Sequence, residues 1–259
     1  MPATPADITA RGVLWQASRC RPAGRFWLTI PGVAHYLVEG GERIVVDVAG
    51  ADRAAAQRFV GTAPLAALFY QRGMLALHAA AFLPDENRQA AVLLAGNSGA
   101  GKSTLLAALA QRGAVPLSDD LSPLALDQRG RVVVYRNPGF VRLWPDASRQ
   151  LGIDGEVIDA GMFSPSFEHY PLAAIYWLSV HGYKDVEIRS VQGKQRFDAV
   201  GRLTYNTHIA DALLERSAYF QLAAAITQQV PIVRVRRPLG RWCLDALIRA
   251  VSSPQQPEA

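Results

Sequence analysis

The pattern of hydrophobic and polar positions divides the chain into two stretches of different character. Residues 25–48 contain short alternating runs, interrupted by Pro31-Gly32 and Gly40-Gly41. This pattern is typical of a small antiparallel sheet with a hairpin turn at the second glycine pair. The alanine-rich stretch 51–70 has apolar residues at helical spacing and predicts one or two helices. We therefore expect a small β-rich and helical region over residues 1–70.

The remainder of the chain alternates apolar strand-like runs with segments of helical spacing. Strands are expected at residues 75–83, 91–96, 131–135, 172–180, 186–191 and 230–238. The first two of these strands are expected to form a hairpin around a polar turn at residues 84–89. Helices are expected at residues 103–113, 208–229 and 239–253. This alternation predicts an α/β domain over residues 71–259.

Composition and charge exclude several classes of protein. The chain has 27 basic and 22 acidic residues and a formal net charge of +5, but it contains no dense basic tract typical of nucleic-acid binding. No apolar run approaches the roughly 18 residues that cross a bilayer, and the first residues lack the order of a secretory signal. The only cysteines, Cys20 and Cys243, lie far apart. We expect a reduced, cytoplasmic protein that binds neither nucleic acid nor a membrane.

One short motif carries a clear chemical prediction. Residues 96–103, GNSGAGKS, fit the phosphate-binding pattern G-x-x-x-x-G-K-[ST] between an expected strand and an expected helix. The backbone N–H groups of such a loop face phosphate oxygens, and the helix dipole adds positive potential. Lys102 would neutralise the β- and γ-phosphates, and Ser103 would ligate Mg²⁺. The predicted binding residues for ATP are Gly96, Asn97, Ser98, Gly99, Ala100, Gly101, Lys102, Ser103 and Thr104.

The class of P-loop protein depends on the carboxylates near the motif. ABC-type ATPases have an LSGGQ-like signature and a later apolar strand ending in Asp-Glu, and this chain has neither. It has instead Asp119 and Asp120, at the point where the chain returns from the helix toward the P-loop strand. One carboxylate can hold Mg²⁺ while the other accepts a proton from an incoming hydroxyl. The alternative is a solvated Ser-Asp-Asp turn or a helix cap; beside this P-loop we favour a role in catalysis.

A histidine upstream of the motif extends this set. His78 lies in QRGMLALHAAAF, where the pattern alone favours a histidine of the core. However, the order Arg-Gly, Leu-His-Ala, apolar strand, GNSGAGKS, Arg-Gly and Asp-Asp over residues 71–121 resembles the catalytic domain of HPr serine kinase/phosphorylase. The resemblance implies an HPr kinase/PEP carboxykinase-type P-loop domain with a central mixed sheet. It also implies that Asp119 is the acid/base residue, Asp120 its companion at the metal, and His78 an active-site histidine.

The chain departs from that family at several points. Thr104 stands where the family has Glu, and the closest match to the family's arginine-containing, glycine-rich signature is residues 136–146. The family's N-terminal domain is replaced by the region containing IPGVAHYLVEGG. That phrase, QRGMLALHAAAF and GFVRLWPD are similar to stretches of the HPr-kinase-like proteins encoded with lasso peptide machinery. Members of that group phosphorylate a serine at or near the C-terminus of a precursor peptide, which implies a peptide or small protein as the substrate.

Several arginines have two interpretations each. Arg142 follows a turn, and it can bind substrate by projecting toward a transferred phosphate or an acidic peptide terminus, or it can be a surface residue beside Trp144. Arg234, Arg236 and Arg237 lie in an alternating strand, where the first two share one face. We favour a solvated sheet face for them, with a peptide-binding patch as the alternative.

These residues together predict an ATP-dependent serine kinase. ATP would bind at Gly96–Ser103 with its charge neutralised by Lys102 and by Mg²⁺ on Ser103 and Asp120, while Asp119 accepts the hydroxyl proton and His78 orients the group. Two alternatives are a small-molecule kinase with a metabolite acceptor and an accessory protein that binds nucleotide without chemistry. The sequence leaves open the choice between ATP and GTP, the role of residues 1–70 and the presence of a homo-oligomer.

Overall fold

The computed structural model describes residues 14–18, 24–48, 53–85, 89–137, 140–142, 157–159, 168–182 and 185–252. The chain packs into two compact units, one of residues 1–76 and 205–220 and the other of residues 77–204 and 221–259. The boundary that the sequence predicts after residue 70 stays a prediction. None of the helices in the described ranges combines the length and apolar character needed to cross a membrane.

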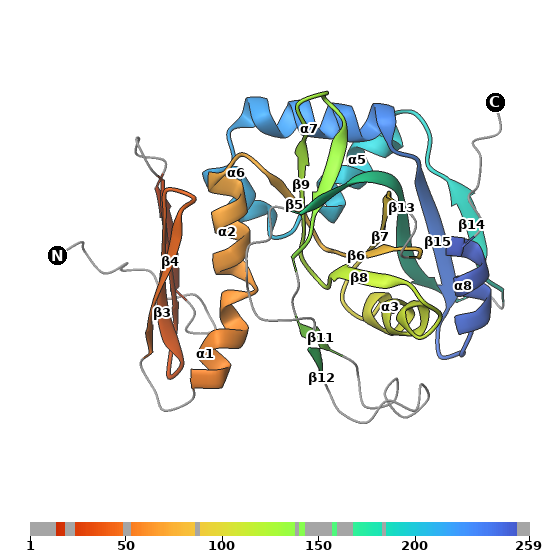
Figure 1. Cartoon of the computed structure of the whole chain (residues 1–259), viewed down its shortest axis with the longest axis horizontal. Helices are drawn as coiled ribbons and strands as arrows, with labels where there is room; N and C mark the ends of the chain where they lie inside the picture. The colour runs from red at the N-terminus through yellow and green to blue at the C-terminus, as the bar shows by residue number, and fades with distance from the viewer. Residues whose placement is uncertain are drawn as a thin grey trace. The chain divides into compact units, whose positions relative to one another are not determined.

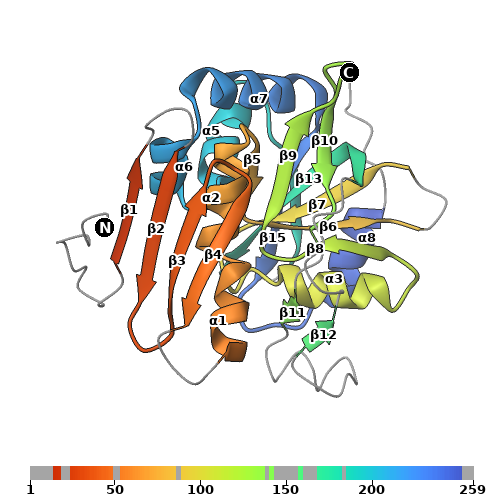
Figure 2. The same ribbon diagram turned by 60° about the vertical axis from the view of Figure 1, so that its left-hand side comes forward.

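The first unit contains a four-stranded antiparallel sheet in the order β1-β2-β3-β4 (Figure 2). Its strands are β1 (Leu14–Ser18), β2 (Arg25–Ile30), β3 (Ala34–Glu39) and β4 (Arg43–Val48). Strands β3 and β4 pair from Ala34 with Val48 to Glu39 with Arg43. The turn between them is Gly40-Gly41, and both glycines have a positive φ. The predicted hairpin and small antiparallel sheet are therefore confirmed.

Helices of the first unit pack on this sheet. They are α1 (Arg53–Val60), α2 (Ala63–Gln71) and α6 (Thr207–Leu213). The first two confirm the helices predicted from the alanine-rich stretch. Gln71 Nε2 at the end of α2 donates to the carbonyl oxygens of Gly24 and Val38, at 2.9 and 3.2 Å. The Tyr36 hydroxyl on β3 donates a hydrogen bond to the Ala56 carbonyl of α1 at 2.8 Å. Hydrogen bonds therefore join both α1 and α2 to the sheet.

The second unit is built on a curled mixed sheet. Its strands run in the order β9-β10-β13-β7-β6-β8, with β15 paired to β13 and β14 paired to β15. The bounds are β6 (Ala79–Leu83), β7 (Ala91–Ala95), β8 (Val115–Ser118), β9 (Ser122–Leu126), β10 (Val132–Tyr135), β13 (His169–His181), β14 (Glu187–Ser190) and β15 (Ile232–Pro238). Strands β7 and β15 run parallel to β13, and the other pairs are antiparallel. This confirms the predicted α/β class with a central mixed sheet and the predicted hairpin of β6 and β7.

Helices α3 (Lys102–Ala110) and α8 (Leu244–Ser252) lie side by side on this sheet (Figure 1). The core beneath them consists of alternate strand residues and the apolar faces of both helices. It includes Phe82, Leu94, Leu105, Leu106, Tyr176, Leu178, Val235, Leu247 and Ile248. Because β7 and β13 are covered in this way and run parallel, their carboxyl ends meet at one edge, where the loop after β7 begins.

Five features differ from the sequence predictions. Residues 75–83 form two strands, β5 (Leu75–Leu77) and β6, because the His78 N–H bonds to the Leu203 carbonyl at 2.7 Å instead of continuing the ladder. The helix expected at 208–229 is broken into α6 and α7 (Arg216–Gln229), since buried Leu214 is extended. Helix α5 (Lys194–Leu203) was not predicted, and α8 begins five residues later than expected. A short pair, β11 (Phe140–Arg142) and β12 (Val157–Asp159), stands apart from the main sheet.

Candidate functional site

The loop from Gly96 to Gly101 connects β7 to α3 with an unusual backbone. Gly96, Gly99 and Gly101 have φ values of 146, 79 and 102°, which L residues rarely adopt. A Cβ on Gly96 would lie 2.4 Å from the Leu178 carbonyl oxygen on β13. The loop therefore passes so close to the neighbouring strand that only glycine fits at its first position.

Gly96→Ala is expected to damage the loop far more than Gly99→Ala. A Cβ on Gly99 meets no atom within 4 Å, so that change incurs only the left-handed backbone penalty of about 1–2 kcal/mol. On Gly96 the added methyl also displaces the backbone of β13. Thermal unfolding of both variants checks this, and equal falls in the melting temperature would contradict the close approach.

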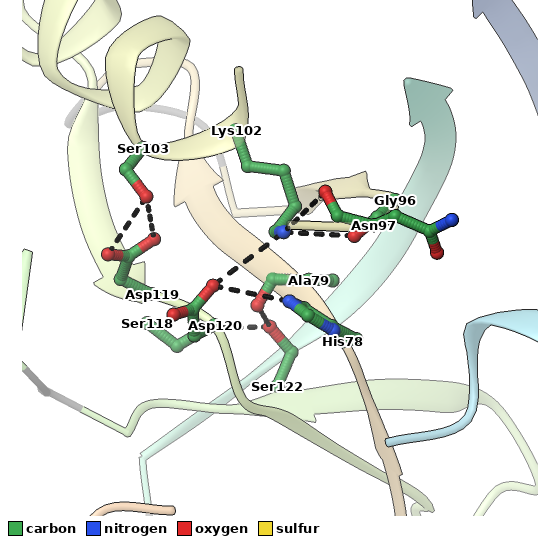
Figure 3. Close-up of polar contacts among 10 residues, drawn as sticks. All are labelled: His78, Ala79, Gly96, Asn97, Lys102, Ser103, Ser118, Asp119, Asp120 and Ser122. Carbon is green, nitrogen blue, oxygen red and sulfur yellow. Dashed lines mark hydrogen bonds and ion pairs between the residues drawn. The ribbon is translucent and has the colours of Figure 1, made fainter. Parts of the chain in front are cut away.

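Lys102 is the first residue of α3 and lies almost fully buried, with a side chain 4% exposed. Its Nζ donates to the carbonyl oxygens of Gly96 and Asn97, at 2.9 and 3.4 Å, and lies 3.6 Å from Asp120 Oδ1 (Figure 3). Burial lowers the pKa of Lys102, and the charges of Asp120 and Asp119 oppose that shift. The structure thus places a desolvated ammonium group within the loop, at the N-terminus of a helix, where anions bind.

ATP, the ligand that the sequence predicts for this loop, is expected to bind more weakly at alkaline pH because of Lys102. The ammonium form binds phosphate, so free protein that carries neutral Lys102 must take up a proton on binding. Because the pKa of Lys102 is lowered, the weakening of ATP binding begins at a pH below the usual lysine range. Above that pH the Kd for ATP rises by up to about tenfold per pH unit. Calorimetric titrations from pH 7 to 10 measure the Kd for ATP. Lys102→Met is the control, and its Kd should not rise in this way with pH. A constant Kd across this range would contradict the burial of the charge.

The two carboxylates of the Asp-Asp pair contact different residues, and Asp119 contacts Ser103. Ser103 Oγ, in the first turn of α3, lies 3.0 and 3.2 Å from the two carboxylate oxygens of Asp119 (Figure 3). Asp119 follows the end of β8 and is 7% exposed. Ser103 and Asp120 are the metal ligands predicted from the sequence. In the structure Ser103 instead contacts Asp119.

The second contact joins Asp120 to His78 and Lys102. His78 Nε2 lies 3.4 Å from Asp120 Oδ1, and Lys102 Nζ lies 3.6 Å from the same oxygen. The hydrogen bond from His78, followed by the charge of Lys102, holds the pKa of Asp120 below its usual range, against the opposing effect of burial. Asp120 has a φ of +62°, and its side chain is 64% exposed. Left-handed backbone at a non-glycine residue is found disproportionately at functional sites.

The turn that carries both carboxylates is held by residues that sequence reasoning missed. The hydroxyls of Ser118 and Ser122 lie 2.7 Å apart, and Ser122 donates to the Ala79 carbonyl at 2.8 Å. Asn137 donates from its main chain to the Leu117 carbonyl and from its side chain to the Leu121 carbonyl, at 2.9 and 3.0 Å. The only hint of these bonds in the sequence is that Ser118 and Ser122 lie on either side of Asp119-Asp120. These bonds fix the strained conformation of Asp120.

The other predicted residues differ in their exposure and in whether the structure describes their side chains. Asn97, Ser98 and Gly99 are exposed at the tip of the loop, Ala100 is buried, and Thr104 is half-buried in α3. The backbone of Arg142 lies in β11, and its side chain lies outside the described residues, as do Trp144 and Cys20.

The three arginines of β15 have separate partners. Arg234 stacks over the Trp177 ring at 4.7 Å, and Arg236 pairs with Glu187 at 2.9 Å. Arg237 points to the P-loop, where it donates to the Ala100 and Gly99 carbonyls, each at 2.8 Å. Sequence reasoning missed this contact, although the alternation of the strand places Arg237 on the face opposite Arg234 and Arg236.

The oxygen atoms at this site fit Mg²⁺ carried by a nucleotide. Ser103 Oγ and the buried carboxylate of Asp119 are hard oxygen ligands on adjacent elements. Within the ranges that the structure describes, no cluster of three or more His, Cys, Asp or Glu side chains could hold a metal by itself. Mg²⁺ usually takes one or two protein ligands together with phosphates and water, so this sparse set suits it.

Comparisons with known proteins give similarity at the level of structure. No family model and no curated protein match the chain. Among solved structures, the chain is similar to the Hpr(Ser) kinase/phosphatase from Coxiella burnetii, with 14% identity over 68% of this chain and 91% of that one and a TM-score of 0.33. A similarity at this level carries no weight for function, which has to be inferred from the contacts in the site.

Proposed function

We propose that the protein is an ATP-dependent kinase that transfers the γ-phosphoryl group to a serine hydroxyl of a peptide. The observation that carries this proposal is the division of the Asp-Asp pair at the P-loop. Asp119 contacts the hydroxyl of Ser103, whereas Asp120 contacts Lys102 and His78. A module that only binds nucleotide needs the loop, but it does not need a second, exposed carboxylate beside it.

The loop and Lys102 form the phosphate-binding part of the proposed site. The amides at the start of α3 and the Lys102 ammonium group present positive charge to the β- and γ-phosphates of ATP. Burial strengthens that attraction because little water screens it. When phosphates bind, Lys102 exchanges its contacts with the Gly96 and Asn97 carbonyls for phosphate oxygens.

Ser103 and Asp119 would hold Mg²⁺ in this proposal. The metal would supply neutralisation of charge on the β- and γ-phosphate oxygens. The hydrogen bonds between Ser103 and Asp119 support their assignment as a pair, because a P-loop Ser and a carboxylate at the end of a neighbouring strand commonly share one Mg²⁺.

Asp120 is the proposed acceptor of the hydroxyl proton. Its exposed carboxylate is accessible to an incoming hydroxyl, and His78 and Lys102 hold one of its oxygens. His78 would orient the carboxylate and stabilise charge during transfer. This assignment exchanges the roles that the family resemblance implies for Asp119 and Asp120, and the contacts of Ser103 and His78 are what favour the exchange.

The serine acceptor comes from the resemblance of residues 71–121 to the HPr kinase family and of shorter phrases to lasso precursor kinases. ADP release tests the acceptor class, with serine-ended peptides resembling lasso precursors compared with hydroxyl-bearing metabolites. We expect release that depends on the peptide. Release with metabolites alone would replace the peptide by a small molecule, and ATP binding without release under any condition would leave a nucleotide-binding accessory protein.

A further inference from the structure

Arg237 lies near the carboxyl end of β15, two strands away from the P-loop strand. Strand β13 stands between β15 and β7, and Arg237 pairs in register with Val180 on β13. From there its side chain reaches the loop. Nε donates to the Ala100 carbonyl and Nη2 to the Gly99 carbonyl, each at 2.8 Å. One planar guanidinium group therefore holds two successive carbonyl groups of the loop.

The hold on the Ala100 carbonyl fixes the direction of the next amide in the loop. In a trans peptide the carbonyl and the N–H point in opposite directions. Because Arg237 holds the Ala100 carbonyl on its own side, the Gly101 N–H points away from Arg237. Gly101 is also the N-cap of α3, so this N–H belongs to the set of helix N-terminal amides that bind anions.

Gly101 is packed against the same side chain. A Cβ at Gly101 would lie 3.4 Å from Arg237 Nε, at the short end of ordinary van der Waals contact. The guanidinium group therefore packs directly beside Gly101, whose left-handed backbone favours glycine.

We infer that Arg237 is a positioning residue that holds the P-loop in the conformation that accepts phosphates. The inference rests on the proposed binding of ATP at this loop. A lysine replaces it only in part, because an ammonium group lacks the planar fork that donates to two acceptors at once. Arg236, the neighbouring residue on the opposite face of β15, pairs with Glu187 and supplies a matched control for binding.

The test compares the binding of ATP and of inorganic pyrophosphate by calorimetry in the wild type, Arg237→Gln, Arg237→Lys and Arg236→Gln. We expect Arg237→Gln to raise the Kd of both ligands by about tenfold or more, since two charged hydrogen bonds to the loop are lost. Arg237→Lys should recover part of the loss, and Arg236→Gln should bind like the wild type. Pyrophosphate is included because the effect lies in the phosphate cradle and should not require the base.

A second measurement separates positioning from general destabilisation. Added guanidinium at millimolar concentration should restore ATP binding to Arg237→Ala without restoring it to Lys102→Ala. Binding by Arg237→Gln equal to that of the wild type, or no recovery by either Arg237→Lys or guanidinium, would overturn the inference and leave the proposed function intact. Failure of the wild type to bind ATP would instead overturn the proposed function itself.

Discussion

Lys102→Ala is expected to weaken ATP binding by about a hundredfold or more. The change removes the buried ammonium group at the centre of the loop, and charge-assisted hydrogen bonds to phosphates in a desolvated site are among the strongest polar contacts in proteins. ATP-dependent activity should disappear with the binding. Calorimetric titration of ATP in the presence of Mg²⁺ measures the effect.

The fold should survive this substitution. Burial lowers the pKa of Lys102, which means that the folded state disfavours its charge, so loss of the charge itself should not lower the melting temperature of the ligand-free protein. Lys194→Ala, at an exposed lysine at the start of α5, is the matched control and should bind ATP normally. Wild-type ATP affinity in Lys102→Ala would remove the basis for the nucleotide site.

Asp119→Asn and Asp120→Asn are expected to fail in different ways. Asp120→Asn should bind ATP and Mg²⁺ but lose phosphoryl transfer by about a hundredfold to ten-thousandfold, the usual contribution of a general base. Asp119→Asn should raise the Mg²⁺ concentration needed to support ATP binding, because a charged oxygen ligand beside Ser103 is replaced by an amide. Single-turnover transfer rates and Mg²⁺ titrations of ATP binding separate the two effects.

The reverse pattern would return the roles to those implied by the family resemblance. That pattern is loss of transfer with unchanged Mg²⁺ dependence in Asp119→Asn, and a raised Mg²⁺ requirement in Asp120→Asn. Asp245→Asn provides the control for the loss of a carboxylate away from the site, since Asp245 is 75% exposed and pairs with Arg112 outside the site. It should match the wild type in both measurements.

Much of the second unit could be predicted because its signals are local. The P-loop lies between a strand and a helix within one short stretch, and the apolar runs before it form the expected hairpin of β6 and β7. The interruption at His78 could not be predicted from the apolar pattern, because it depends on a bond to Leu203, far along the chain. Helix α5 was missed because only Ala199, Val200 and Leu203 are buried along it, which leaves a weak apolar pattern.

The partners within the site were the least predictable part. Asp119 and Asp120 are adjacent in sequence, and which of them meets Ser103 is decided by the left-handed backbone of Asp120 and by the bonds from Asn137 that hold the turn. The role of Arg237 depends on the strand order that places β15 beside β13, and this order involves segments far apart in sequence. Alternation along the strand gave the face of each arginine but not the partner on that face.

The most direct test of the proposed kinase is an intact-mass measurement on a serine-ended peptide incubated with the protein, ATP and Mg²⁺. We predict the gain of one phosphoryl group with the wild type, a gain at least about a hundredfold slower with Asp120→Asn, and no gain when the acceptor serine of the peptide is replaced by alanine. An unchanged peptide mass with wild-type protein that has been shown to bind ATP would contradict the proposal that this site phosphorylates a peptide serine.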